Sequence, residues 1–454
     1  MAERGLSGWL AQVRHAREDE WWVQRSLAVA FSWYIVWQAT ITPARLWPDT
    51  TLYQAQAGLP IWSARFWYGI KPPLTSLLWK LTGGASGFTL AQSVIFVASW
   101  LFLASTFATF FTGLLRRASA TVLVLVFASS APVMIWNRSV LSDSLALSAV
   151  AVLMAAVLRY AGGGSTRQAA YVVLAALLNV LVRYSQIVPV ALVALVVLVV
   201  DVSRRRPDRS RRRGVVLFGL LLLVALLSSG LAKQSGVTSL EMPSLYATRV
   251  FPLPGRVAWF AAHGMPDAPG IDRQAARTPA SPSGKVVIAT SPVVTSWLAS
   301  HGESLYVQWL LTHPLTLLSD PIAHPGWAYY SDGGNVLVYA APNRTDAPWS
   351  ALLYPGWRWC VGEALLGILL GFMLLRRVDR TTWILIALGV IGVATMLAAW
   401  DTSGQETDRH MLEGAVMFRM SALMLLAWGA LRWRRATVSA LGARLTSSEA
   451  ADVA

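Results

Sequence analysis

Cysteine and charged residues are both scarce in this 454-residue chain. The single cysteine, Cys360, excludes an internal disulfide, and it leaves the redox compartment open. Only 13% of the residues are charged, whereas 55% are hydrophobic and the mean hydropathy is +0.50. A soluble core does not account for that balance, so the composition indicates a membrane protein.

Apolar runs long enough to cross a bilayer recur along the chain. Because a spanning helix needs about 20 residues, we expect a polytopic α-helical membrane protein with about ten transmembrane helices. The first run is long and aromatic, so we interpret it as an uncleaved helix and not as a signal peptide. The expected helices cover residues 26–44, 89–114, 119–136, 143–158, 169–182, 186–201, 215–232, 359–375, 381–400 and 411–431.

Acidic residues are scarcer than basic ones, with 23 Asp and Glu against 38 Lys and Arg, which gives a net charge of +15. The arginines concentrate in alternate connections between the expected helices. By the positive-inside rule we expect both termini to lie in the cytoplasm. We also expect the protein to lie in the plasma (inner) membrane. The run from Arg204 to Arg213 is interpreted as an orientation signal on an anionic leaflet, and no nucleic-acid partner is expected.

This topology divides the chain into five parts. We expect a cytoplasmic segment at 1–25, helices one to seven at 26–232 with a first outer loop at 45–88, an outer (periplasmic) domain at 233–357, helices eight to ten at 358–435, and a disordered-looking cytoplasmic tail at 436–454. The outer domain is expected to be mixed α/β or mostly α. It contains a strand candidate at 286–288 and an amphipathic helix candidate at 303–318, which would lie on the membrane or pack under the domain.

Ionisable residues gather in the outer connections, where partial desolvation makes them candidates for function. One carboxylate among several cations suits an anionic substrate whose leaving group carries phosphate. The set comprises Asp49 and Lys71 in the first outer loop, Arg138 and Asp143 between the third and fourth helices, Arg183 and Tyr184 between the fifth and sixth, and Arg409 and His410 in the last outer loop.

Four of these residues also have a simpler interpretation, whereas Arg183 is less easily dismissed because the turn around it is otherwise apolar. Asp49 and Asp143 both stand where a helix N-cap is expected, and Lys71 and Arg138 could extend to lipid headgroups. The histidines show no metal-ligand spacing on one helix. We therefore expect no cofactor, and a divalent metal is disfavoured.

Three stretches of the first half resemble GT-C glycosyltransferases, which are polytopic enzymes that use polyprenyl-phosphate-linked sugars. The stretches are Trp47–Tyr53 (WPDTTLY), Trp67–Leu78 (WYGIKPPLTSLL) and Val140–Leu145 (VLSDSL), and the late Thr407–Met411 (TDRHM) is similar to a segment before the last helix of such enzymes. The superfamily includes protein O-mannosyltransferases, lipid A aminoarabinose transferases, and the mannosyl- and arabinosyltransferases of actinobacterial envelopes.

The resemblance implies a role for each matching residue. Asp49 would be the general base of an inverting transfer, Lys71 would contact the lipid phosphate, and Asp143 would match an acid or amide at the start of the fourth helix. Arg138, Arg183 and Arg409, with Tyr184 and His410, would complete the substrate site. Relatives often carry a second acid beside the first, whereas threonines follow Asp49 here, which argues against a metal-dependent version.

The implied partners are a polyprenyl-phosphate-linked sugar donor, a glycan or lipid acceptor of the cell envelope, and membrane lipids. Richness in Ala, Val, Leu and Arg suggests an actinobacterium and makes arabinofuranose or mannose plausible donor sugars. Two other classes of function stay open: a lipid or glycan transporter or flippase, and a non-catalytic subunit of an envelope assembly complex. A transporter needs charged or broken segments near mid-bilayer, whereas the strongest charges here lie at helix ends, with Glu363 and Arg419 as the exceptions.

Overall fold

The computed structural model describes residues 2–203, 207–267, 288, 291–323, 349, 357–375, 378–403 and 407–451. Within these ranges every regular element is a helix, and one isolated parallel bridge joins Arg45 to Ser139. The elements of the first half are α1 (Ala2–Ile41), α2 (Pro48–Ala57), α3 (Ala64–Trp67), α4 (Pro73–Thr82), α5 (Ala85–Ala108), α6 (Leu114–Ala128), α7 (Ala131–Met134), η1 (Ile135–Arg138), α8 (Asp143–Gly163), α9 (Thr166–Val182), η2 (Tyr184–Gln186) and α10 (Ile187–Val202).

The second half begins with a long helix and continues through a set of short ones. It comprises α11 (Pro207–Ser235), α12 (Val237–Arg249), α13 (Pro254–Ala262), α16 (Pro292–Trp297), the π-helical turn η3 (Leu298–Gly302), α17 (Glu303–Thr312), α18 (Thr316–Ala323), α22 (Trp357–Leu374), α23 (Arg380–Thr402), α24 (Thr407–His410) and α25 (Leu412–Ala451). The tail after Ala436, which the sequence predicted to be disordered, is therefore helical to Ala451.

Several described helices are long and apolar enough to cross a membrane, so the protein is a multi-pass α-helical membrane protein. These match six of the ten predicted runs, while α9 and the described part of α22 are shorter apolar helices. The total of ten stays a prediction. The six long spans are Ala85–Ala108, Asp143–Gly163, Tyr184–Val202, Arg212–Ser235, Arg380–Thr402 and Leu412–Arg432.

The predicted span at 119–136 is not one straight helix. The chain bends by 64° between α6 and the pair formed by α7 and η1. Pro132 lies in the first turn of α7. Because proline lacks an N–H and its ring clashes with the preceding turn, it kinks or breaks a helix that would otherwise continue through this position. After the bend, α7 and η1 lead to the start of α8.

The described part of the segment 233–357 is a cluster of short helices around an aromatic core. Tyr246, Phe260, Tyr306 and Trp309 are buried together there. The helix predicted at 303–318 is broken between α17 and α18, because Pro314 disfavours a helical conformation at the residue before it. The strand candidate at 286–288 lies outside the described residues except Ile288, which is helical.

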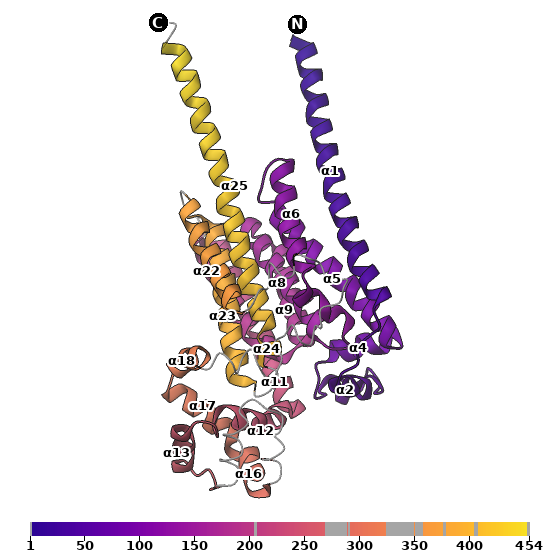
Figure 1. The fold of residues 1–454 in the computed structure, drawn as a ribbon, viewed down its shortest axis with the longest axis vertical. Coiled ribbons are helices and arrows are strands. Elements are labelled where there is room, and N and C mark those ends of the chain that lie inside the picture. The colour runs from indigo at the N-terminus through magenta and orange to yellow at the C-terminus, as the bar shows by residue number, and fades with distance from the viewer. Residues whose placement is uncertain are drawn as a thin grey trace.

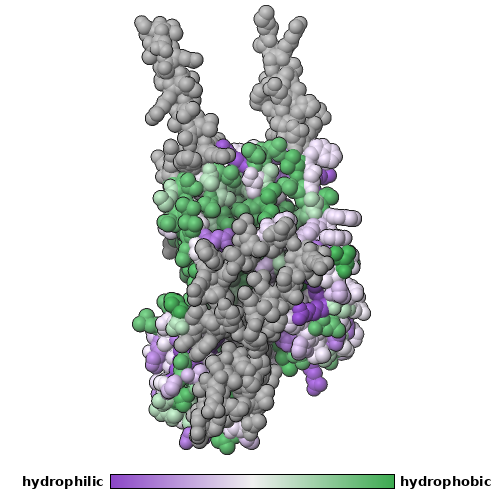
Figure 2. Space-filling model, viewed as in Figure 1, coloured by the Kyte–Doolittle hydropathy of each residue, from purple (hydrophilic) through white to green (hydrophobic). Residues whose placement is uncertain are grey.

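Both chain ends lie at the same end of the molecule, and α2, α4 and the short helices α12 to α18 lie at the opposite end (Figure 1). Hydrophobic side chains are prominent on the surface of the bundle between these ends, whereas the end with the short helices is more mixed (Figure 2). The central helix is α8, whose spanning segment is 83% buried and packs against α5 and α9.

Close packing of α23 against α25 fixes the position of α24, the short helix between them that carries Arg409. A side chain at Gly392 would lie 2.6 Å from the main-chain nitrogen of Phe418 and 2.7 Å from the carbonyl oxygen of Gly414. Only glycine allows this approach, as in other membrane helix pairs with small residues at the contact. The start of α25 is thereby fixed against the bundle next to α8.

Candidate active site

Asp49 does not cap the helix on which it lies. Helix α2 begins at Pro48, its N-cap is Trp47, and the Thr50 hydroxyl accepts a hydrogen bond from the Trp47 main-chain nitrogen at 2.9 Å. The same hydroxyl donates to the carbonyl of Val140 at 3.0 Å. The capping interpretation of Asp49 is therefore wrong, and threonine satisfies the helix start that the acid was expected to satisfy.

The Asp49 carboxylate instead contacts two cations. Its Oδ2 lies 3.0 Å from Lys71 Nζ and 3.6 Å from Arg409 Nη2. Lys71 immediately precedes Pro72 and Pro73, which start α4, and its ammonium lies 5.8 Å from the centre of the Tyr53 ring. Lys71 therefore faces the acid, which gives it a partner other than the lipid headgroups considered from the sequence.

Asp143 is the first residue of α8, but it too is not the cap. The N-cap position belongs to Ser142. Both carboxylate oxygens of Asp143 accept from Arg409 Nε, at 3.0 and 3.1 Å, and Oδ1 also accepts from Arg183 Nη2 at 3.2 Å. The capping interpretation of Asp143 is wrong as well, because two arginines from distant parts of the chain take the carboxylate.

Glu413 completes the network and was missed in the sequence interpretation. It forms a hydrogen-bonded ion pair with Arg183, and both side chains are buried. A signal was present, since Glu413 is an acid just inside the last apolar run, and such acids are functional candidates by default. The structure thus joins α8, the turn before α10 and the start of α25 through buried charges.

The exposure of the charged side chains in this network decreases from the surface inward. The side chains of Asp49 and Lys71 are 32% and 21% exposed, whereas those of Asp143 and Glu413 are only 1% and 2% exposed. Arg409 touches both layers, since its Nη2 also lies 3.0 Å from Asp143 Oδ2. The surface acid therefore rests on a buried frame that fixes the arginine behind it, an arrangement that suits a preorganised site.

The remaining predicted site residues lie around this network. Tyr184 donates to the Gly69 carbonyl at 3.1 Å, which ties the Lys71 segment to η2. The His410 ring hydrogen-bonds with Ser403 at 2.8 Å. Arg138 is buried, and its carbonyl accepts from the Arg45 main-chain nitrogen at 2.7 Å, so its main chain helps hold the first outer connection against the start of α8.

Charges around Asp49 set its protonation. Burial raises the pKa of the Asp49 carboxyl, but Lys71 and Arg409 outweigh that effect and hold the pKa below its usual value. Burial together with Arg183 and Arg409 holds the pKa of His410 well below its usual value. At neutral pH the resting site thus presents an ionised carboxylate and a neutral imidazole.

Among the described residues no three His, Cys, Asp or Glu side chains come together as a metal site; Glu406 lies outside those residues. The chain matches no protein-family model and no curated protein. The chemistry of the site is therefore argued from its own residues. They supply one partly exposed carboxylate, two adjacent cations and a buried frame of charge.

Proposed function

We propose that the protein is a membrane glycosyltransferase that moves a sugar from a polyprenyl-phosphate donor to a hydroxyl of an envelope glycan or lipid. The observation that carries this proposal is the contact of the partly exposed Asp49 carboxylate with both Lys71 and Arg409. The buried acids Asp143 and Glu413 lie behind this contact. A base beside two phosphate-binding cations is the set of groups that such a transfer requires.

In the proposed reaction the donor phosphate binds Lys71 and Arg409. The acceptor oxygen attacks the anomeric carbon as the bond from that carbon to the phosphate oxygen breaks. The phosphate leaves with the bonding electrons, and the acceptor proton passes to Asp49. Because this is a single displacement, the anomeric configuration inverts. The cations stabilise the charge that develops on the leaving phosphate.

The same contacts couple donor binding to the strength of the base. Before the donor binds, Lys71 and Arg409 keep Asp49 ionised but weakly basic. A bound phosphate would compete for both cations and place a like charge near the carboxylate. Each change raises the pKa of Asp49 toward the working pH, where a general base is most effective.

This coupling predicts two different acid limbs in the pH dependence of transfer. The limb of kcat/KM reports the free enzyme, where the depressed pKa of Asp49 keeps the base ionised to below the usual pH of about 4. The limb of kcat reports the donor complex and is expected about one unit or more higher. Steady-state rates measured from pH 3 to 8 test this, and coincident limbs would contradict it.

Lys71→Gln offers an independent check of the same electrostatics. Removing this cation is expected to raise the acid limb of kcat/KM, because the pKa of Asp49 in the free enzyme then rises toward its usual value. Arg167→Gln is the matched control, since Arg167 is exposed in α9 and its Nε donates to the Tyr171 hydroxyl at 2.7 Å. If the pH profile of kcat/KM for Lys71→Gln coincides with that of the wild type, Lys71 does not lower the pKa of the base as proposed.

Transfer is expected to need no divalent metal, because Lys71 and Arg409 offer the positive charge that a metal would bring to the leaving phosphate. Treatment with a chelator should leave the rate unchanged and the product anomerically inverted. Loss of transfer on chelation, with recovery on adding Mg²⁺ or Mn²⁺, would contradict this part of the proposal.

The proposal includes an orientation of the protein in the membrane. Arg116, Arg117, Arg159 and Arg213 stand at helix ends remote from α2, on the side expected to be cytoplasmic. The active site would then lie on the periplasmic face of the inner membrane, beneath the short helices α12 to α18. Those helices would shape the acceptor groove, and the isoprenoid tail of the donor would lie between spanning helices.

A transporter or flippase is the second candidate, and one contact favours it. Arg419, inside the last span, pairs with Glu363 on α22, and the arginine also lies 5.6 Å from the centre of the Phe127 ring. Charged pairs inside a membrane often mark substrate paths. Transfer of sugar to an acceptor and movement of the intact donor across a bilayer separate the two candidates.

A further inference from the structure

A second feature lies toward the other end of the bundle, in a groove between α1, α5 and α6. The groove has a volume of about 830 Å³, which falls within the roughly 300–1,000 Å³ of small-molecule sites. Its α5 residues run from Ala98 to Ser105, in the half of the helix remote from α4 and α2. The groove is therefore separate from the cluster around Asp49.

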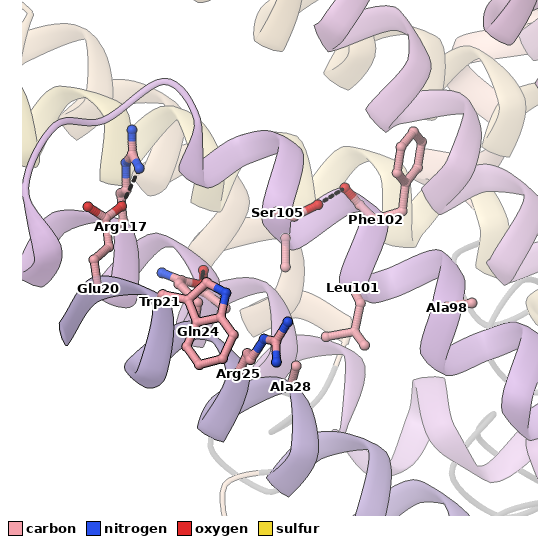
Figure 3. A pocket seen from close by; sticks show the side chains of 12 residues that line it. Glu20, Trp21, Gln24, Arg25, Ala28, Ala98, Leu101, Phe102, Ser105 and Arg117 are labelled. Carbon is pink, nitrogen blue, oxygen red and sulfur yellow. Dashed lines mark hydrogen bonds and ion pairs between the residues drawn. The ribbon is translucent and has the colours of Figure 1, made fainter. Parts of the chain in front are cut away.

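One end of the groove is charged. Arg117 is held there by an ion pair with Glu20 (Figure 3). Its Nε also donates to the Phe111 carbonyl at 2.9 Å. Arg25 lies over the Trp21 ring at 3.6 Å and pairs with no carboxylate among the described residues. Among the residues that line the groove, two arginines and one glutamate give a net charge of +1.

The rest of the groove is apolar. Ala98, Leu101 and Phe102 of α5 form one wall, and Ala28 of α1 lies on the other side. From Ala98 to Ser105 the helix rises by about 10 Å at 1.5 Å per residue. Trp21 and Trp22 are exposed beside the charged end, as aromatic residues are at the membrane interface. The charged end thus lies at headgroup level, and the apolar wall runs into the hydrocarbon.

We propose that this groove binds one anionic glycerophospholipid, with its phosphate between Arg25 and Arg117 and an acyl chain along the α5 wall. The net charge of +1 matches one phosphodiester. A soluble phosphate would use the arginines and leave the apolar wall empty, so the combination favours a lipid. The lipid would bridge α1 to α5 and α6 in the leaflet on the side of the chain termini.

The test uses the full-length protein stripped of lipid in detergent and titrated with phosphatidylglycerol or phosphatidylcholine. Native mass spectrometry measures the number of lipids retained, and thermal unfolding measures their effect on stability. We expect one retained phosphatidylglycerol, preferred over phosphatidylcholine, and a higher melting temperature with it. Arg25→Gln should weaken that retention about fivefold, and the double variant with Arg117→Gln should weaken it further.

Two matched variants separate the possible causes. Arg167→Gln removes an exposed arginine outside the groove and should change nothing. Ala98→Trp keeps both arginines but fills the apolar wall, and it should abolish retention in a protein that still elutes as a folded monodisperse species. A loss caused by misfolding would appear in the elution profile and in the melting curve without lipid.

Several results would overturn the proposal. These are equal retention of the two phospholipids, retention unaffected by the arginine substitutions or by Ala98→Trp, and failure of stripped protein to take up phosphatidylglycerol. Full competition by soluble glycerol phosphate would show a headgroup site without a lipid chain. Preferential retention of polyprenyl phosphate would replace the proposed occupant with a different lipid.

Discussion

Asp49→Asn is expected to reduce sugar transfer by about 10² to 10⁴, the usual contribution of a positioned general base. Asparagine keeps the size and a hydrogen-bonding oxygen but cannot accept the acceptor's proton. Because Asp49 is partly exposed and does not cap α2, the substitution should leave the fold intact. Donor binding should be little changed or slightly stronger, since Lys71 and Arg409 lose their competing carboxylate.

The control for this substitution is Asp267→Asn. Asp267 is exposed on the outer segment, so the same chemical change there should leave transfer at the wild-type rate. Rates are measured under single-turnover conditions, with elution and melting curves for each variant. A folded Asp49→Asn protein that transfers sugar as fast as the control would move the base to another residue.

Asp143→Asn is expected to destabilise the protein by about 3–5 kcal/mol, the range for breaking a buried ion pair. The carboxylate is almost fully buried and accepts hydrogen bonds from both Arg183 and Arg409. Without it, Arg409 loses the hydrogen bonds of its Nε to Asp143 and the 3.0 Å ion pair of its Nη2. The midpoint of unfolding in detergent should fall well below that of wild type and of Asp267→Asn.

A double-mutant cycle makes the Asp143 prediction specific. Arg409→Gln combined with Asp143→Asn removes both partners, so the double variant should be less destabilised than the sum of the two single variants. The difference measures the coupling between the two side chains. Additive losses, or an Asp143→Asn midpoint equal to wild type, would contradict the role assigned to this buried frame.

The sequence singled out most of the residues that gather around Asp49 in the structure, but it did not show how they pair. Asp143 and Arg409 are 266 positions apart and Arg183 and Glu413 are 230 apart, so no local pattern relates them. The local pattern favoured capping for Asp49 and Asp143, because an aspartate in a WPDTT or LSDSL stretch suits the start of a helix. Capping was wrong because Trp47 and Ser142 occupy the cap positions and the distant arginines attract the acids.

Local signals for the breaks in the helices were present in the sequence. Pro132 lies inside the apolar run at 119–136, and Pro314 lies inside the amphipathic pattern at 303–318. In both cases the hydrophobic periodicity outweighed the proline in the sequence interpretation, and the structure bends or breaks the helix there. The helical membrane architecture was predicted well because it depends on composition and run length. The donor, the acceptor and the roles of the site residues stay predictions.

The central claim is that the cluster around Asp49 breaks a bond between sugar and lipid phosphate. Purified wild-type protein in proteoliposomes, supplied with radiolabelled polyprenyl-phosphate sugars and envelope acceptors, tests it most directly. The account predicts labelled acceptor of inverted anomeric configuration and free polyprenyl phosphate in equal amounts. The claim would be contradicted, and a transporter supported, if the labelled donor crosses the bilayer intact and none of the donor sugars tested gives a product.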